Sequence, residues 1–221
     1  MARVRMSGAF DAPNGRIGNL VFVRLPSGGA SMRDLTVGRD PRTASQQAWR
    51  QAVGRATRLY QTLDEDEHAA WRAFVMETHE AGGTPSLTPP PRVYNVFVAL
   101  TAKFLSLSPT LEPPRLPPAS LFTGDGIIVS ALGEPGAVRF TASGPNAGQV
   151  TTELLLQWVP SPGRRPSPGK YRIAGAHAFA SAGESVAVPA RPGVVYAAIR
   201  FASLANGQSS NLVPMGRVTV G

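Results

Sequence analysis

Cysteine is absent from this 221-residue sequence, and histidine occurs only three times. Without cysteine the chain forms no disulfide framework and no thiolate metal site, and it has no thiol nucleophile. Charged residues are few at 16%, while apolar residues make up 43%, too many for a wholly disordered chain. A chain of this length can bury a real core, and we expect two domains that are stabilised by packing or by neighbouring subunits.

Long apolar runs are also missing. The most apolar stretch, from Val93 to Leu107, contains Asn95, Lys103 and Ser106 and is shorter than the roughly 20 residues of a membrane helix. The charged N-terminus is not followed by an uninterrupted apolar core, so no secretory signal is predicted. We therefore expect synthesis in the cytoplasm and no membrane partner.

The patterns that usually carry catalysis are missing as well. His68 and His79 are eleven residues apart, about three turns along one predicted helix, and are too distant to share a metal. The acidic run 64–67 lacks the glycine and the terminal glutamate of a calcium loop. No Gly-x-Ser-x-Gly elbow occurs. These observations predict a protein that is not an enzyme and has no catalytic residues, no metal and no cofactor.

Charge is distributed unevenly along the chain. Residues 1–60 carry +7, residues 61–110 carry −3, and the remainder carries +4. Arginine outnumbers lysine 20 to 2, which reflects either selection for bidentate contacts or a GC-rich genome. The basic N-terminal arm is expected to contact an acidic protein surface or, as an alternative, nucleic acid.

The first zone, residues 1–38, predicts a basic β-hairpin arm. Residues 15–25 form one expected strand, Pro26 to Gly29 form a turn, and residues 30–37 return as a second strand. Because a two-stranded ribbon is marginal alone in water, this arm must pack on its own helices or on another subunit.

The second zone, residues 39–108, predicts three helices. Apolar residues from Ala48 to Leu63, Trp49 included, follow the helical period after Pro41. Asp64 and Glu67 form a capping-box pattern at the start of a second helix, which carries Trp71, Phe74 and Val75 on one face and ends at Gly82. A third helix covers residues 93–107.

A proline-rich linker, residues 109–119, separates this zone from the C-terminal domain, residues 120–221. Seven short β-like runs there alternate with Gly/Pro turns: 126–132, 137–142, 152–159, 170–180, 185–188, 194–203 and 211–220. The spacing is typical of a β-sandwich, with Leu154, Leu156 and Trp158 on one face of their strand. The fold class predicted for the whole chain is α+β.

The order of Leu154 to Pro160, Tyr171-Arg172-Ile173, Tyr196 and Asn206 to Ser210 resembles the strands and loops of fibronectin type III and related immunoglobulin-like modules over about 70 residues. The resemblance implies a seven-stranded immunoglobulin-like sandwich. Tyr196 departs from it, because it does not share strand parity with Ile199 and Phe201 unless a bulge intervenes.

The N-terminal half carries a second resemblance. Gly15-Arg16-Ile17-Gly18-Asn19, Asp40-Pro41-Arg42-Thr43 with Gln46-Gln47, and Leu63 to Trp71 are similar to segments of poorly characterised phage and prophage proteins. The resemblance implies a phage-like structural protein located in the virion, whose partners are other capsid or tail proteins or copies of itself in a symmetric assembly.

The resulting hypothesis is a virion structural protein that decorates or stabilises a capsid by docking through its arm and helices. A tail or head-to-tail component, a nucleic-acid-binding protein and an adhesion module remain the alternatives. The interface candidates are Arg16, Phe22, Arg24, Arg33, Arg39, Arg42, Trp49, Arg164 and Arg165.

Overall fold

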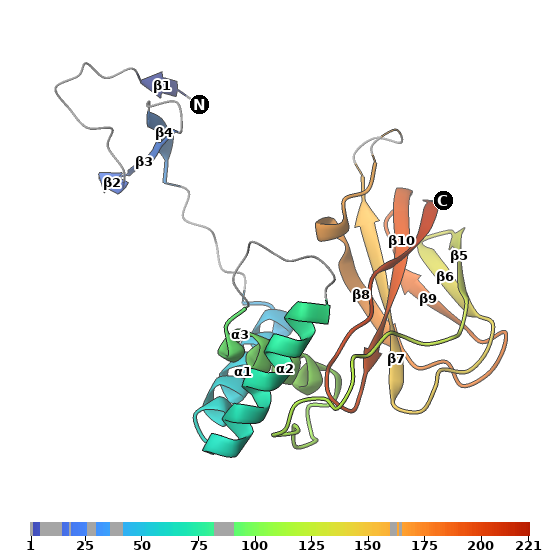
Figure 1. Ribbon diagram of the computed structural model, residues 1–221. Coiled ribbons are helices and arrows are strands. Elements are labelled where there is room, and N and C mark those ends of the chain that lie inside the picture. The colour runs from blue at the N-terminus through green and yellow to red at the C-terminus, as the bar shows by residue number, and fades with distance from the viewer. Residues whose placement is uncertain are drawn as a thin grey trace. The chain divides into compact units, whose positions relative to one another are not determined.

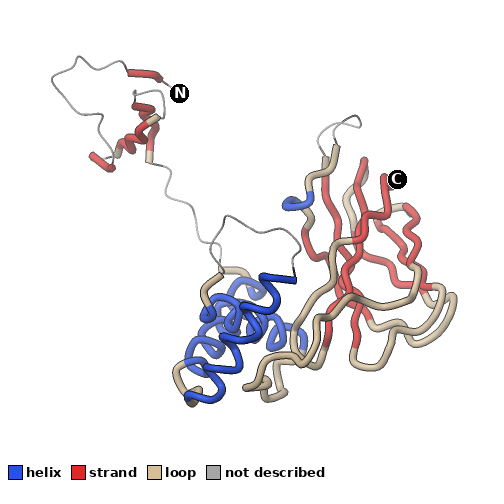
Figure 2. Tube along the Cα trace, viewed as in Figure 1, coloured by secondary structure: helices blue, strands red, loops and turns tan. Residues whose placement is uncertain are grey.

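A computed structural model describes residues 2–4, 15–17, 19–25, 30–35, 42–81, 91–159, 163 and 165–221. The chain divides into two compact units, Met1–Thr43 and Ala44–Gly221. Figure 1 labels the elements and Figure 2 distinguishes helices, strands and loops. The fold class is α+β, as the sequence predicts. We call Ala44–Gly221 the body.

The N-terminal unit contains a four-stranded antiparallel sheet in the order β1-β4-β3-β2. The predicted hairpin is confirmed as β3 (Leu20–Arg24) paired with β4 (Ala30–Asp34). One continuous strand over residues 15–25 is wrong, however, because the chain reverses after Ile17 and β2 (Gly15–Ile17) pairs with β3. β1 (Ala2–Val4) pairs with β4 on the other side. The predicted turn at 26–29 lies outside the described residues.

The three predicted helices are α1 (Ala44–Tyr60), α2 (Glu65–Ala81) and α3 (Val93–Leu107). The capping box at the start of α2 is confirmed, since the Asp64 N–H donates to Glu67 Oε2 and the Glu67 N–H donates to Asp64 Oδ1, both at 2.8 Å. These bonds satisfy two backbone donors that the first turn would leave unpaired. Gly82, the predicted end of α2, lies outside the described residues.

α3 is the helix that the other two share. Ala52 and Ala56 of α1 pack against Ala102 and Phe104 of α3, where small side chains allow a close approach. On its other side α3 inserts Phe97 among aromatic residues of α1 and α2. The rings in contact there are Tyr60, Trp71, Phe74 and Phe97.

The C-terminal half of the body is a sandwich of two antiparallel sheets, β11-β10-β7-β8 and β5-β6-β9. This arrangement of seven strands agrees with the predicted immunoglobulin-like sandwich. The strands are β5 (Val129–Glu134), β6 (Ala137–Ala142), β7 (Val150–Trp158), β8 (Arg172–His177), β9 (Ser185–Pro189), β10 (Gly193–Ser203) and β11 (Val213–Val220).

The sandwich core follows the two-residue alternation of its strands. Leu154 and Leu156 of β7 and Val195 and Ile199 of β10 point between the sheets. Trp158 departs from the expected core position, because it lies at the end of β7 and is 41% exposed.

The opposite face of the four-stranded sheet carries its own contacts, and we call it the outer face. Tyr196 packs there beside Leu155, Tyr171 and Ala198. The parity of β10 therefore turns Tyr196 away from the core, and the bulge in the β10–β11 pairing falls after it, between Ala197 and Ala198.

The proline-rich segment 109–119 lies against the helices. The Trp71 indole Nε1–H donates to the Arg115 carbonyl at 2.7 Å, and the Arg115 guanidinium binds the Glu67 carboxylate at 2.5 Å. This ion pair raises the pKa of Arg115 and lowers the pKa of Glu67. The linker thus packs on the helices within the same compact unit, Ala44–Gly221.

Candidate functional site

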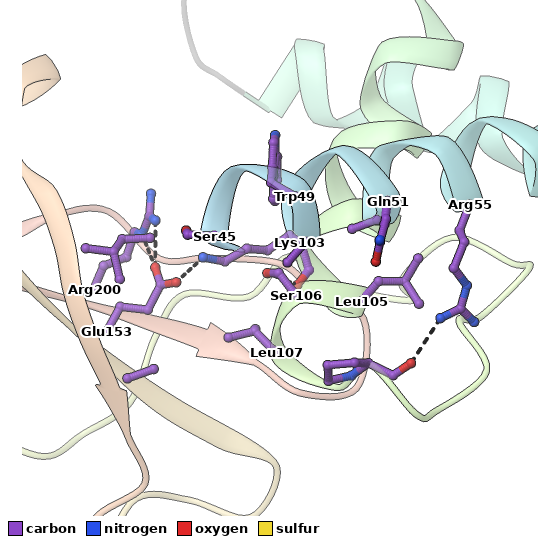
Figure 3. Close-up of a pocket in the computed structure, with 15 residues that line it drawn as sticks. Ser45, Trp49, Gln51, Arg55, Lys103, Leu105, Ser106, Leu107, Glu153 and Arg200 are labelled. Atoms are coloured by element: carbon purple, nitrogen blue, oxygen red, sulfur yellow. Dashed lines mark hydrogen bonds and ion pairs between the residues drawn. The ribbon is translucent and has the colours of Figure 1, made fainter. Parts of the chain in front are cut away.

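A pocket of about 680 Å³ lies between the helices and the outer face of the sandwich. Its walls come from α1, from the C-terminal half of α3 and from strands β7, β8 and β10, and Figure 3 shows its side chains. The volume is in the range of small-molecule sites in proteins. The lining residues are Ser45, Ala48, Trp49, Gln51, Ala52, Arg55, Lys103, Leu105, Ser106, Leu107, Pro109, Glu153, Ile173, Ala176 and Arg200.

The floor of the pocket is an ion cluster of Glu153, Lys103 and Arg200, which we call the charge cluster. The Glu153 side chain is only 2% exposed. Its Oε1 accepts from Lys103 Nζ, and its Oε2 accepts from Arg200 Nε at 2.8 Å and Nη2 at 2.6 Å. Figure 3 shows the carboxylate between the two cations. Both carboxylate oxygens are therefore engaged.

Strand alternation brings the cluster together. Leu154 and Leu156 face the core, so Glu153 between Thr152 and Leu154 faces outward towards α3. Arg200 on β10 is the register partner of Glu153 on β7, so the two side chains stand on the same face. Lys103 arrives from α3, 50 residues earlier in the chain.

Burial acts on Lys103 more strongly than its partner does. Removal from water lowers the pKa of the Lys103 ammonium, and the hydrogen bond and charge of Glu153 oppose this effect without cancelling it. A single carboxylate stands between two cations, so the cluster keeps a net charge of +1 with all three groups ionised. With Arg55 the pocket carries three cations and one anion.

The loop Asn206–Gln208 between β10 and β11 is a second contact of the sandwich with α3. Gly207 has a φ of +77°, and a Cβ there would lie 2.2 Å from the Leu100 carbonyl oxygen and 2.7 Å from the Phe104 nitrogen. Only glycine allows this approach of loop backbone to helix backbone. The charge cluster and this contact hold α3 to the sandwich at two places.

The rim of the pocket is apolar and accessible. Trp49 of α1 is 46% exposed and Ile173 of β8 is 52% exposed. Arg55, also on α1, donates from Nη1 to the Pro109 carbonyl at 3.0 Å and closes one end of the pocket. The pocket therefore presents apolar side chains around a net positive charge.

The predicted interface residues do not gather at one place. Trp49 is the one that lines the pocket. Phe22, Arg24 and Arg33 belong to the N-terminal sheet, where Phe22 is half-buried and the two arginines are exposed. Arg42 and Arg165 are exposed, Arg16 is described only as part of the β2 backbone, and Arg39 and Arg164 lie outside the described residues.

Glu153, Lys103 and Arg200 were not predicted as site residues. A signal for two of them is nevertheless present, because Glu153 is the one charge in β7 and Lys103 the one charge in α3. Isolated charges in apolar segments are expected to be paired when buried. The sequence does not indicate the partner, because the pair spans 50 residues.

Comparisons with protein-family models, with curated proteins and with solved structures found no match for this chain. No group of acidic and histidine side chains that could hold a metal occurs among the described residues. Within the described ranges, no helix has both the length and the apolarity to cross a membrane.

Proposed function

We propose that this protein is a structural component of a phage-like virion that decorates or stabilises the capsid by docking on neighbouring subunits. The observation that carries the proposal is the division of the chain into two units of different character. A body in which helices and an immunoglobulin-like sandwich are joined through buried contacts follows a small basic sheet that forms a separate unit. The similarity of Gly15 to Asn19 and of Asp40 to Thr43 to phage protein segments supports the particle context.

The N-terminal sheet has the character of a docking element. Ala30 is the one buried residue among the described side chains of this unit, while Val23 is 41% exposed. The four strands of this sheet have only 3, 3, 5 and 5 residues, and a sheet this small is marginal by itself. A neighbouring subunit that covers the sheet would supply the missing burial.

The pocket chemistry favours binding over catalysis. A general acid or base needs a proton that it can exchange with a substrate. Both carboxylate oxygens of Glu153 instead accept hydrogen bonds, one from Lys103 and one from Arg200, in a cluster that joins α3 to the sheet. The arrangement is suited to fixing geometry and to presenting positive charge beneath an apolar rim.

Particle incorporation tests the proposal. Virions assembled with the full chain and with a variant that lacks residues 1–43 are purified by density gradient and analysed by quantitative mass spectrometry. The full chain is expected in many copies per particle and the shortened chain in far fewer. Arg191→Glu in a sandwich loop serves as the surface control and is expected to be incorporated like the full chain. Copy number also separates a capsid role from a tail role. Equal incorporation of the shortened chain would contradict docking through the N-terminal unit.

Nucleic-acid binding is the second candidate, because Arg24 and Arg33 are exposed on the N-terminal sheet. Neutralised phosphates make such binding strongly dependent on salt. Fluorescence anisotropy with labelled duplex DNA is expected to give affinity that falls steeply with salt and disappears when residues 1–42 are deleted. No binding at low salt would remove this candidate.

A further inference from the structure

A second surface of the body has the charge opposite to that of the pocket. Asp64, Glu65 and Asp66 are exposed at the start of α2, and the Glu65 side chain is 82% accessible even though it pairs with Arg72. We call these three residues, together with the apolar Leu116 that follows the Glu67-bound Arg115, the acidic end.

The apolar part of the acidic end comes from the proline-rich segment. Leu116 is 59% exposed. Arg115 fixes this segment beside the start of α2 by binding Glu67 and by donating to the Thr62 carbonyl at 2.7 Å. The acidic end therefore combines negative charge, which is opposite to the net charge of the pocket, with an accessible leucine that can pack on the apolar rim.

The two surfaces lie at different ends of α1. The pocket is lined by Ser45 to Arg55, whereas the acidic end follows the C-terminus of α1. At a helical rise of 1.5 Å per residue, the middle of the pocket wall and the turn at Thr62 are about 18 Å apart along the axis of α1. The acidic end of one chain is thus too far away to fill its own pocket.

We propose that the acidic end of a second copy of this chain docks in the pocket between α1 and the sandwich. In this arrangement Asp66 of the second copy faces Arg55, and its exposed Leu116 meets the apolar rim at Trp49 and Ile173. The pocket contains three cations and one anion, so its net positive charge attracts the acidic run. Contact between two pockets would bring like charges together and would be repulsive.

The geometry of this contact is head-to-tail. Different patches of the two copies meet, so each docked copy still offers one pocket and one acidic end. Such heterologous contacts produce rings when the rotation closes and open filaments when it does not. The inference deepens the proposed function by naming a partner, yet it concerns the purified chain and does not depend on the particle.

Sedimentation velocity of the full chain is the first test. The mass is expected to rise above the 23.3 kDa of one chain as concentration increases at about 0.05 M salt, and to return towards it at about 0.5 M salt, where charges are screened. A single species of monomer mass at low salt, at chain concentrations up to about 200 µM where even weak contacts between copies would form, would overturn the proposal.

Charge reversal makes the test specific. Arg55→Glu and Asp66→Arg each place like charges in contact and are expected to weaken association about tenfold or more. The double variant, or an equimolar mixture of the two single variants, is expected to restore it. Arg191→Glu changes the net charge by the same amount away from both surfaces and is expected to leave association unchanged.

Trp49→Ala provides a readout that does not depend on charge. Truncation of an exposed aromatic anchor is expected to weaken association about fivefold or more, and circular dichroism verifies that each variant is folded. Association that persists in Arg55→Glu and Trp49→Ala would show that the copies meet through another surface and would overturn the proposal. Loss in both single reversals without recovery in the double variant would contradict the pairing of Arg55 with Asp66.

Discussion

Glu153 shows how a single side chain connects two parts of the body. Its carboxylate is buried on the outer face of β7. Its ion pairs with Lys103 of α3 and Arg200 of β10 offset the free-energy cost of removing the charge from water. A buried ion pair adds little net stability compared with an apolar replacement, but removal of one partner leaves the other charges uncompensated. The asymmetry makes Glu153 a sensitive position.

Glu153→Gln is expected to reduce the free energy of unfolding by about 3 kcal/mol, because Lys103 and Arg200 lose the one carboxylate that faces them. Urea denaturation of the full chain measures the loss. Glu134→Gln is the matched control, since Glu134 forms an accessible pair with Arg139 and exposed pairs contribute little. Equal stability of the two variants would contradict the structural role of the charge cluster.

Asp125 predicts a pH dependence. Burial raises the pKa of its carboxyl, but hydrogen bonds from Asn146 Nδ2 at 3.0 Å and from the Ala147 and Gly126 N–H groups outweigh this and lower the pKa. The folded-state pKa thus lies below the unfolded value of about 4. Asp125 stabilises the fold above that value, and this contribution disappears as the pH falls through the folded-state pKa.

Asp125→Asn is accordingly expected to be less stable than the parent protein by about 1 kcal/mol at pH 7, with a difference that narrows as the pH is lowered below 4. Urea unfolding at a series of pH values measures it, with the exposed Asp66→Asn as control. A difference that stays constant through the acid range would show that the charge of Asp125 is not what the surrounding donors stabilise.

Elements were predictable where one local pattern dominates. The apolar period of Val93 to Leu107 and the capping box at Asp64 depend on neighbours within a few residues, and both are confirmed. The reversal after Ile17 was missed, because β-forming residues on both sides of a very short turn look like one strand. Trp49 was assigned both to the apolar face of its helix and to the interface candidates, and its side chain is exposed at the rim of the pocket.

The pocket itself could not be predicted, because its walls come from segments that no local pattern connects. Lys103 and Glu153 are isolated charges, and their meeting depends on how α3 docks on the sheet. Gly207 reads as an ordinary turn glycine in Asn206-Gly207-Gln208, although its backbone touches α3. Such long-range contacts set the site, whereas local propensities set the elements.

Gly207→Ala is expected to destabilise the protein by about 3 kcal/mol or more, since the new methyl group would collide with the α3 backbone in addition to straining a positive φ. Gly136→Ala separates the two effects, because Gly136 has a φ of +72° and open space around its Cβ position. About 1 kcal/mol is expected there from strain alone. Thermal unfolding compares the variants, and equal losses would argue against the close contact.

At the scale of the whole molecule, the helices and the sandwich are expected to unfold together. Buried contacts join them at the charge cluster and at Gly207, so opening one half exposes the other. Hydrogen exchange measured by mass spectrometry is expected to give similar opening free energies for the slowest amides of α3, β7 and β10. Much faster exchange throughout α3 would indicate two independently folding parts.

A compact body with a cationic pocket and an acidic end, preceded in the chain by a separate basic sheet, is suited to repeated assembly, in which many modest contacts add up. The central claim is that this assembly takes place on a virion. Cryo-electron microscopy of purified intact particles tests it most directly. The account predicts density for the helix–sandwich body at symmetry-related positions on the particle. Intact particles that contain no copy of the chain would contradict it.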